Sequence, residues 1–246
     1  MVEGTQGDGT ARSGTPRLPR VRNSIEETQA FFGQKFLPMV DQAVDTKWEH
    51  AKSRAASSSG TTAERVAKTT RVFAVELGAL GATTGAASVI PGTGAGTAVA
   101  AMAVDLGWYT LRTADLIMTI AAIHGHTAAT VEERRAWILS VLAFGDGAGK
   151  GFTRVAEEVG KGLGAKATKR IPMEWLRSIN GALGRTVVTK YGTKRGAIAL
   201  GNILPLGIGA AIGFSGNYAM TRAIARQADR FFAHLPPLLD LGVAPG

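Results

Sequence analysis

Apolar side chains recur at helical spacing along most of the chain, beginning near residue 24. The first stretch has an apolar residue at every fourth position: Phe32, Phe36, Val40, Val44 and Trp48. Ser24 and Glu27 have the spacing of a capping box, which predicts that a helix starts there. Pro38 is expected to kink or split this helix, because proline lacks the backbone N–H that the helix needs.

Two further helices are predicted in the glycine- and alanine-rich part of the chain. Thr61 and Glu64 form a second capping box, and the apolar period of 3.6 residues that follows runs up to Pro91. A long helix is predicted over residues 95–123. Gly125 suits the left-handed backbone conformation that commonly ends a helix.

The second half of the chain shows the same start signals. Thr130 and Glu133 form a third capping box, at the start of the sequence VEERRAWILSVLAF. Pro172 is well placed for the first turn of another helix, and a final helix is predicted from about Pro205 to Phe232. No stretch alternates apolar and polar residues as a strand does. We therefore expect a single all-α domain of seven or eight helices.

Three parts of the chain differ in composition. Residues 1–22 are rich in glycine, threonine, proline and arginine, which predicts a disordered basic arm. This arm has no apolar segment of the kind found in secretory signals. Residues 23–235 are expected to form the helical domain, and residues 236–246 a flexible tail.

Glycine is unusually abundant, with 32 glycines among 246 residues, whereas aromatic residues make up only 7%. A core with few large side chains favours close approach of one helix to another. Pairs of glycines four residues apart suit such contacts: Gly81 and Gly85, Gly92 and Gly96, Gly209 and Gly213. The chain has no cysteine, which excludes disulfides, thiolate zinc sites and cysteine catalysis.

Two runs without charge, residues 77–104 and 196–221, exceed the ~20 residues that a membrane helix requires. The first run, however, has seven large apolar residues against nine alanines and six glycines, so its insertion would be marginal. The segment between the runs carries 14 of the 28 Lys and Arg residues, which exported loops usually lack. We expect both runs to pack together as helical hairpins, with peripheral insertion of one apolar turn left open.

The net charge of +9 is concentrated in residues 150–195, which hold eleven basic and three acidic residues. Such a surface attracts anionic lipid headgroups or nucleic acid, or simply keeps the protein in solution. We expect four of its residues to contact an anionic surface: Lys161, Lys166, Lys169 and Arg170. Nucleic acid is not expected as a partner, because these basic residues lack interleaved aromatic residues.

Motifs for nucleotides and metals are weak. The sequence GTGAGT follows no predicted strand, and GDGAGKGF lacks the first glycine and the Ser/Thr of a Walker A loop. His124 and His126 are close in sequence, but His50 and His234 are distant from them. We therefore expect no cofactor and no metal ion.

Asp105 is the most conspicuous acid, because it interrupts an apolar helix. We expect its carboxylate to pair with an arginine of the last helix, Arg222 or Arg226. A pocket between helices around Asp105 and His124 would instead suit a hydrolase-like enzyme. That alternative lacks a recognisable pair of nucleophile and base.

Two blocks of the chain resemble the EcsC family of bacterial proteins. The first is VIPGTGAGTAVAAMAVDLGWYTLRTADLIMTIAAIHGH, with a Pro-Gly turn, an acidic residue and a long helix. The second is IPMEWLRSINGALGRTVVTKYGTKRGAIALGNILPLGIGAAIGFSGNYAMTRAIARQADRFF. The resemblance spans about residues 60–232, with His124 standing where the family often has tyrosine.

The resemblance implies a helical fold near the cytoplasmic membrane face and no catalytic residues that transfer to this chain. The family is functionally uncharacterised, and it is named for a gene beside an ABC transporter. Together with the basic section, this predicts a non-enzymatic accessory protein of the cytoplasm, peripheral to the inner face of the cell membrane. Its expected partner is anionic lipid or a membrane transport complex.

Overall fold

A computed structural model describes the backbone of residues 20–87, 95–162, 171–201 and 209–235. Side chains are described over residues 29–30, 33–83, 107–161, 171–190 and 213–235. Every regular element in these parts of the chain is a helix, which confirms the all-α fold class. The α-helices are α1 (Arg20–Thr46), α2 (Trp48–Ser57), α3 (Thr62–Ala87), α4 (Ala95–Ile123), α5 (Val131–Phe144), α6 (Ala148–Gly162), α7 (Met173–Gly201) and α8 (Gly209–Ala233); a 3-10 turn, η1, spans Gly145–Gly147.

Local sequence signals set several helix boundaries as predicted. At the start of α5, Glu133 N–H donates to Thr130 Oγ1 at 3.3 Å, and Thr130 N–H donates to Glu133 Oε2 at 2.6 Å. The same reciprocal pair joins Thr61 and Glu64 before α3. The helix α4 has the predicted bounds, and Gly125 follows it with φ +92°. These predicted boundaries are confirmed. Each could be predicted because it depends on a few adjacent residues.

The predicted helix start at Ser24 is wrong, and Pro38 does not split the helix. The helix α1 begins at Arg20, so it starts within the segment assigned to the arm, and Ser24 lies inside the helix. It also continues through Pro38 as one element. Pro38 is exposed, so water can reach the carbonyl of Gln34 that loses its helical donor. The rest of the arm, the tail and the turns at Pro91 and Pro205 lie outside the described residues.

The helix α6 was missed because its sequence GKGFTRVAEEVGKG begins with glycines that are typical of a loop. Its apolar side chains nevertheless follow a helical period, with Phe152 and Val155 buried. Gly151 is required by the turn into α6, because a Cβ there would overlap the ring of Phe144. The motif GDGAGKGF therefore forms η1 and the first turn of α6.

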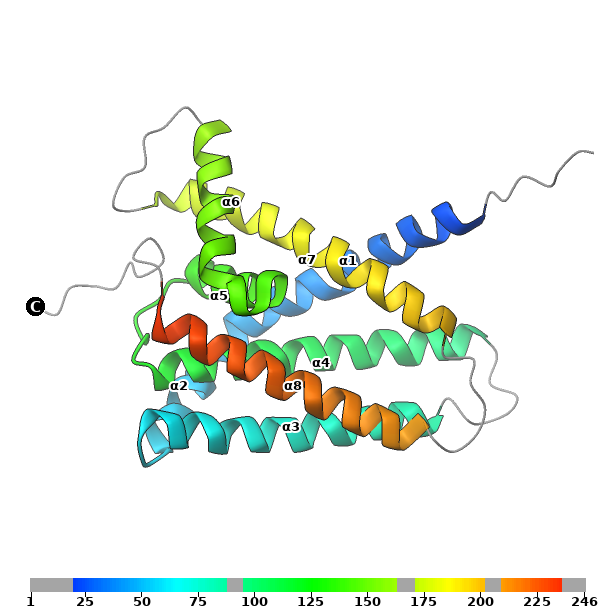
Figure 1. Ribbon diagram of the computed structural model, residues 1–246, viewed down its shortest axis with the longest axis horizontal. Helices are drawn as coiled ribbons and strands as arrows, with labels where there is room; N and C mark the ends of the chain where they lie inside the picture. The colour runs from blue at the N-terminus through cyan, green and yellow to red at the C-terminus, as the bar shows by residue number, and fades with distance from the viewer. Residues whose placement is uncertain (1–19, 88–94, 163–170, 202–208, 236–246) are drawn as a thin grey trace, which may run out of the picture.

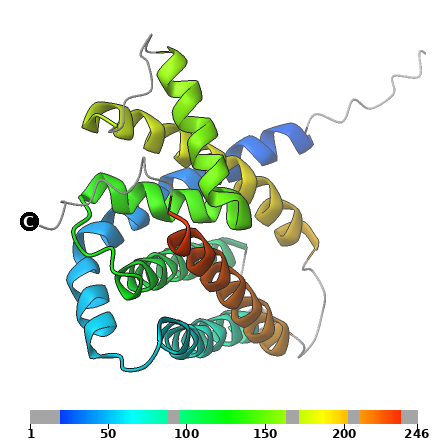
Figure 2. The same ribbon diagram turned by 60° about the vertical axis from the view of Figure 1, so that its left-hand side comes forward.

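The helix α4 is the centre of the molecule (Figure 1). It contacts α1 and α5 on one side and α2, α3 and α8 on the other. In its second half nearly every side chain is buried, including Leu116, Ile117, Met118 and Ile120. The apolar sequence LIMTIAAI is thus explained by burial against protein on all sides. Figure 2 shows α8 lying across the neighbouring helices α3 and α4.

The helices α3 and α8 bring the two charge-free runs together. A Cβ on Gly81 would overlap the backbone carbonyl of Gly213, and a Cβ on Gly213 would overlap that of Gly81. One turn away, Asn217 Nδ2 donates to the carbonyl oxygen of Leu77 at 3.1 Å. The expected packing of the runs against each other is confirmed where both are described. The surroundings of Gly209 lie outside the described side chains.

Candidate anionic-surface interface

Lys161 is exposed near the carboxyl end of α6, as an anion-binding residue would be. The other three residues expected to contact an anionic surface, Lys166, Lys169 and Arg170, lie outside the described residues. Their part in a binding surface stays a prediction.

Several cations of the basic section are already engaged within the protein. Arg154 pairs with Glu158 at 3.2 Å, and Arg177 pairs with Glu132 at 3.3 Å. Lys190 donates from Nζ to the carbonyl oxygens of the last turn of α5, at 3.1 Å to Leu142 and 2.7 Å to Ala143. The charge of this section is therefore less available to an external anion than its composition suggests.

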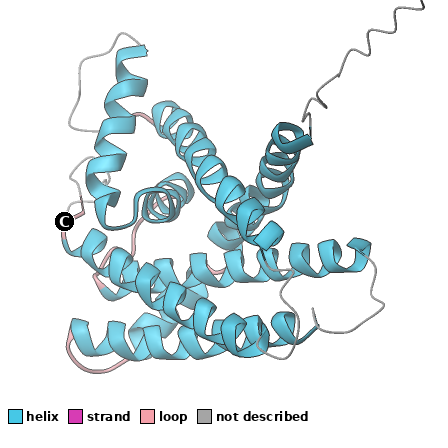
Figure 3. Ribbon diagram, turned by 45° about the vertical axis from the view of Figure 1, so that its right-hand side comes forward, coloured by secondary structure: helices cyan, strands magenta, loops and turns pink. Residues whose placement is uncertain are grey.

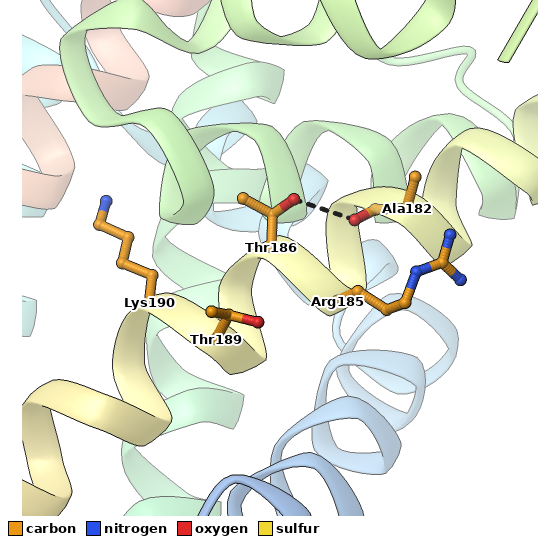
Figure 4. A pocket seen from close by; sticks show the side chains of 5 residues that line it. All are labelled: Ala182, Arg185, Thr186, Thr189 and Lys190. Atoms are coloured by element: carbon orange, nitrogen blue, oxygen red, sulfur yellow. Dashed lines mark hydrogen bonds between the residues drawn. The ribbon is translucent and has the colours of Figure 1, made fainter. Parts of the chain in front are cut away.

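A hollow of about 460 Å³ opens on the side of α7. It is lined by Ala182, Arg185, Thr186, Thr189 and Lys190. Figure 4 shows the side chains of Arg185 and Lys190 pointing to opposite sides, and Thr186 donating to the carbonyl of Ala182 at 3.0 Å. Because the two cations do not converge on one point, this hollow is not an assembled anion site.

A second group of cations lies on α3 and α8, and we call it the α3–α8 basic face: Lys68, Arg71, Arg222 and Arg226. All four side chains are exposed. Among the described residues, none of the four forms an ion pair with a carboxylate. This face therefore keeps its full positive charge.

The pairing of the two helices places these cations level with one another. Gly81 contacts Gly213, and Leu77 contacts Asn217. The two helices therefore run antiparallel, and each residue toward the start of α3 corresponds to one toward the end of α8. Continuing at the same rise puts Arg71 level with Ala223, next to Arg222, and Lys68 level with Arg226. Along the axis of the helix pair, the four charges therefore fall at two levels.

The acidic side chains of α3 and α8 are committed elsewhere. Glu64 accepts from Thr61 at the start of α3, and this hydrogen bonding lowers the pKa of the Glu64 carboxyl. Glu76 pairs with Arg112 of α4. Asp229 pairs with His124 at 2.8 Å. Glu64 and Asp229 lie one turn from Lys68 and Arg226, but neither carboxylate forms an ion pair with these cations among the described residues.

An aromatic ladder on α8 leads up to this face. The ring of Phe214 lies against α3, where a Cβ on Gly78 would be 2.9 Å from it. Tyr218, one turn further along, stacks on Phe214 with ring centroids 5.8 Å apart. Arg222, the next turn, places its guanidinium 5.8 Å from the centre of the Tyr218 ring. An apolar ring, an amphipathic ring and a cation thus follow one another at successive turns.

The expected pairing of Asp105 with Arg222 or Arg226 falls on a side chain outside the described ones; among the described residues, neither arginine pairs with a carboxylate. Arg222 turns instead to the Tyr218 ring. The buried acid of α4 is Asp115, which is 1% exposed. Sequence reasoning passed over it.

Asp115 lies between two arginines in a network that joins α2, α3 and α4. Arg54 donates to Asp115 at 2.9 Å and to Thr119 at 3.0 Å, and Arg112 bridges Asp115 and Glu76. Both guanidinium groups also face the ring of Phe73. All charges of this cluster are matched, so it serves to hold the helices together.

The geometry does not assemble the hydrolase-like site. Asp105 and His124 are about two thirds of the length of α4 apart, about 28 Å at 1.5 Å per residue, so they cannot share one pocket. The ring of His124 is bound to Asp229, and no hydroxyl group hydrogen-bonds it within the described chain. Among the described residues there is also no group of His, Asp and Glu side chains that could hold a metal ion.

The comparisons add no relative, since no protein-family model, curated protein or solved structure matches this chain. The resemblance to the EcsC family therefore stays a prediction. Over the described residues, no helix is both long and apolar enough to cross a membrane. A signal for the α3–α8 basic face exists in the sequence: the pairs Lys68/Arg71 and Arg222/Arg226 have helical spacing, but nothing in it shows that α3 and α8 are neighbours.

Proposed function

We propose that this protein is a non-enzymatic, membrane-proximal accessory protein that docks by charge on an anionic lipid surface at the inner face of the cell membrane. The observation that carries the proposal is the α3–α8 basic face, whose four exposed cations have no carboxylate partner among the described residues. The resemblance of the chain to the EcsC family agrees with a location at the inner face of the cell membrane.

The size of the effect is sufficient for peripheral binding. A basic residue close to an anionic leaflet contributes about 1 kcal/mol. Four such residues contribute about 4 kcal/mol, which corresponds to roughly a thousandfold in partitioning. Lys161, Lys166, Lys169 and Arg170 are proposed as a second contact of the same kind.

The two contacts can be compared in two variants that each remove four positive charges. One variant is K68Q/R71Q/R222Q/R226Q, and the other is K161Q/K166Q/K169Q/R170Q. Co-sedimentation would be measured with vesicles of neutral phosphatidylcholine and of phosphatidylcholine with phosphatidylserine, at 0.1 M and 1 M salt. Equal loss of net charge makes each variant the control for the other.

The wild-type protein should bind only the anionic vesicles and leave them at 1 M salt, where the Debye length is ~3 Å. Greater loss in the first variant assigns docking to the α3–α8 basic face, and greater loss in the second assigns it to the section around Lys161. Binding that ignores lipid charge, salt and both variants would contradict the proposed function. Absence of binding to any vesicle, with capture by a membrane transport complex, would replace lipid by protein as the partner.

A further inference from the structure

One end of the molecule consists of helix segments without a single charged residue. These segments are residues 77–87 of α3, 95–104 of α4, 196–201 of α7 and 209–221 of α8. Figures 1 and 3 show that these four helices all end or begin on the same side of the molecule. We call this side the charge-free end. Four neighbouring helix ends without any charged residue are unusual in a protein that faces only water.

Of the four charges that come first behind this end, two are cations and two are acids. On α7 the nearest charged residue is Arg195, and on α8 it is Arg222. On α3 it is Glu76, which is already paired with Arg112. On α4 it is Asp105. On α7 and α8, the first charged residue next to the charge-free end is therefore an arginine.

The aromatic ladder on α8 connects the charge-free end to these cations. Phe214, in the charge-free end, is 36% exposed although it is a large apolar residue. Tyr218 follows at the next turn and Arg222 at the one after. Eight residues of α-helix separate Phe214 from Arg222, a rise of about 12 Å. The side chains thus change from apolar to amphipathic to cationic over that distance.

This order matches the polarity of a bilayer interface. Apolar side chains favour the acyl boundary, tyrosine rings favour the headgroup level, and arginine extends toward phosphate. An interfacial segment typically enters by 5–10 Å, which is close to the rise of the ladder. A protein partner would favour an apolar patch with a polar rim, and has no need of polarity graded along one helix.

We propose that the charge-free end inserts shallowly into an anionic bilayer, with Phe214 deepest, Tyr218 among the headgroups and Arg222 at the phosphates. This inference rests on the proposed function, because it takes the same lipid surface as the partner. It adds the orientation of the molecule. Arg226 lies about 18 Å along α8 from Phe214, so α8 must lie obliquely for the whole α3–α8 basic face to reach the headgroups.

The absence of cysteine allows a direct measurement of depth, because one introduced cysteine is a unique labelling site. Gly216 lies between Phe214 and Tyr218 along α8 and is exposed with open space around it, so G216C should carry a label without disturbing the fold. Val131, 47% exposed at the start of α5, provides a matched site away from the charge-free end. Each variant would carry an environment-sensitive fluorophore. Quenching would be measured with vesicles of phosphatidylcholine and phosphatidylserine that contain brominated acyl chains.

The label at residue 216 should shift to shorter wavelength and be quenched by the brominated lipid, and the label at 131 should do neither. In the G216C background, F214S/Y218S should lose this quenching while anionic vesicles still retain the protein through its cations. Co-sedimentation with full binding but no quenching at 216 would overturn the insertion and leave the proposed function standing. Failure of unlabelled wild-type protein to bind these vesicles would overturn both. Efficient disulfide cross-linking of G216C between two copies, with no quenching, would instead assign the charge-free end to self-association.

Discussion

Gly81 and Gly213 place the backbones of α3 and α8 in direct contact, since a Cβ on either residue would overlap the carbonyl group of the other. The residues are distant in sequence, yet each lacks a side chain at the one point where the helices meet. The hydrogen bond from Asn217 to the carbonyl of Leu77 adds a polar contact one turn away. This crossing holds the α3–α8 basic face and the aromatic ladder in their relative positions.

Substitution of Gly81 or Gly213 by alanine should therefore destabilise the fold by about 3 kcal/mol. The overlap is with backbone, which cannot move aside as a side chain can, so the cost lies at the upper end for overpacking. Urea denaturation followed by circular dichroism would measure the change.

Gly216 provides the matched control on the same helix. It is exposed and has nothing within reach of an added Cβ. G216A should stabilise the protein by about 0.5–1 kcal/mol through helix propensity alone. Similar effects of G213A and G216A would show that the close contact does not exist.

Asp115 should be the least replaceable acid in the described chain. Its buried carboxylate is shared by Arg54 and Arg112. D115A should destabilise by about 3 kcal/mol, because breaking a buried ion pair leaves charge without a partner, although Arg54 is partly open to water. The pair of Arg230 and Asp146 is exposed, so D146A should change the free energy of unfolding by less than about 1 kcal/mol. Equal effects of the two variants would refute the role of Asp115.

Sequence reasoning succeeded where the signal was local. The bounds of α4 and α5 follow from Gly125, Thr130 and Glu133, which act within one turn of each other. It did not predict α6, although Phe152 and Val155 keep the helical period.

The candidate interface depends on pairs of residues that only the fold brings together. Arg71 and Arg222 are unremarkable in sequence, and only the contact of α3 with α8 brings them to a similar level along the helix pair. For the basic section, residues 150–195, composition overestimates the charge that is available to a partner. Composition counts Lys190 and Arg177 as available charges, whereas the fold gives both an internal partner. Charge composition therefore indicates the class of partner better than it indicates the surface.

Asp41 should give the protein a pH dependence that D41N lacks. Burial raises the pKa of the Asp41 carboxyl above its ordinary value of 3.8, although Arg135 opposes the shift. The folded state therefore holds this proton to higher pH than the unfolded chain does, so its contribution to stability falls as pH rises through that window. The free energy of unfolding of D41N, relative to wild type, should increase from about pH 4 to neutral pH. Urea midpoints at several pH values would check this, and a decrease over that range would contradict it.

Lys190 should matter for folding and not for binding to lipid. Its ammonium group donates to the carbonyl oxygens of Leu142 and Ala143 in the last turn of α5. K190M should destabilise by about 1.5–3 kcal/mol, because it removes charged hydrogen bonds to these acceptors. Its partitioning to anionic vesicles, measured well below the unfolding temperature, should stay within about twofold of wild type. A twofold change corresponds to about 0.4 kcal/mol in the free energy of binding. K150Q removes an exposed cation from the same section and should leave stability unchanged. A K190M variant that folds as stably as wild type but loses vesicle binding would return Lys190 to the anionic-surface interface.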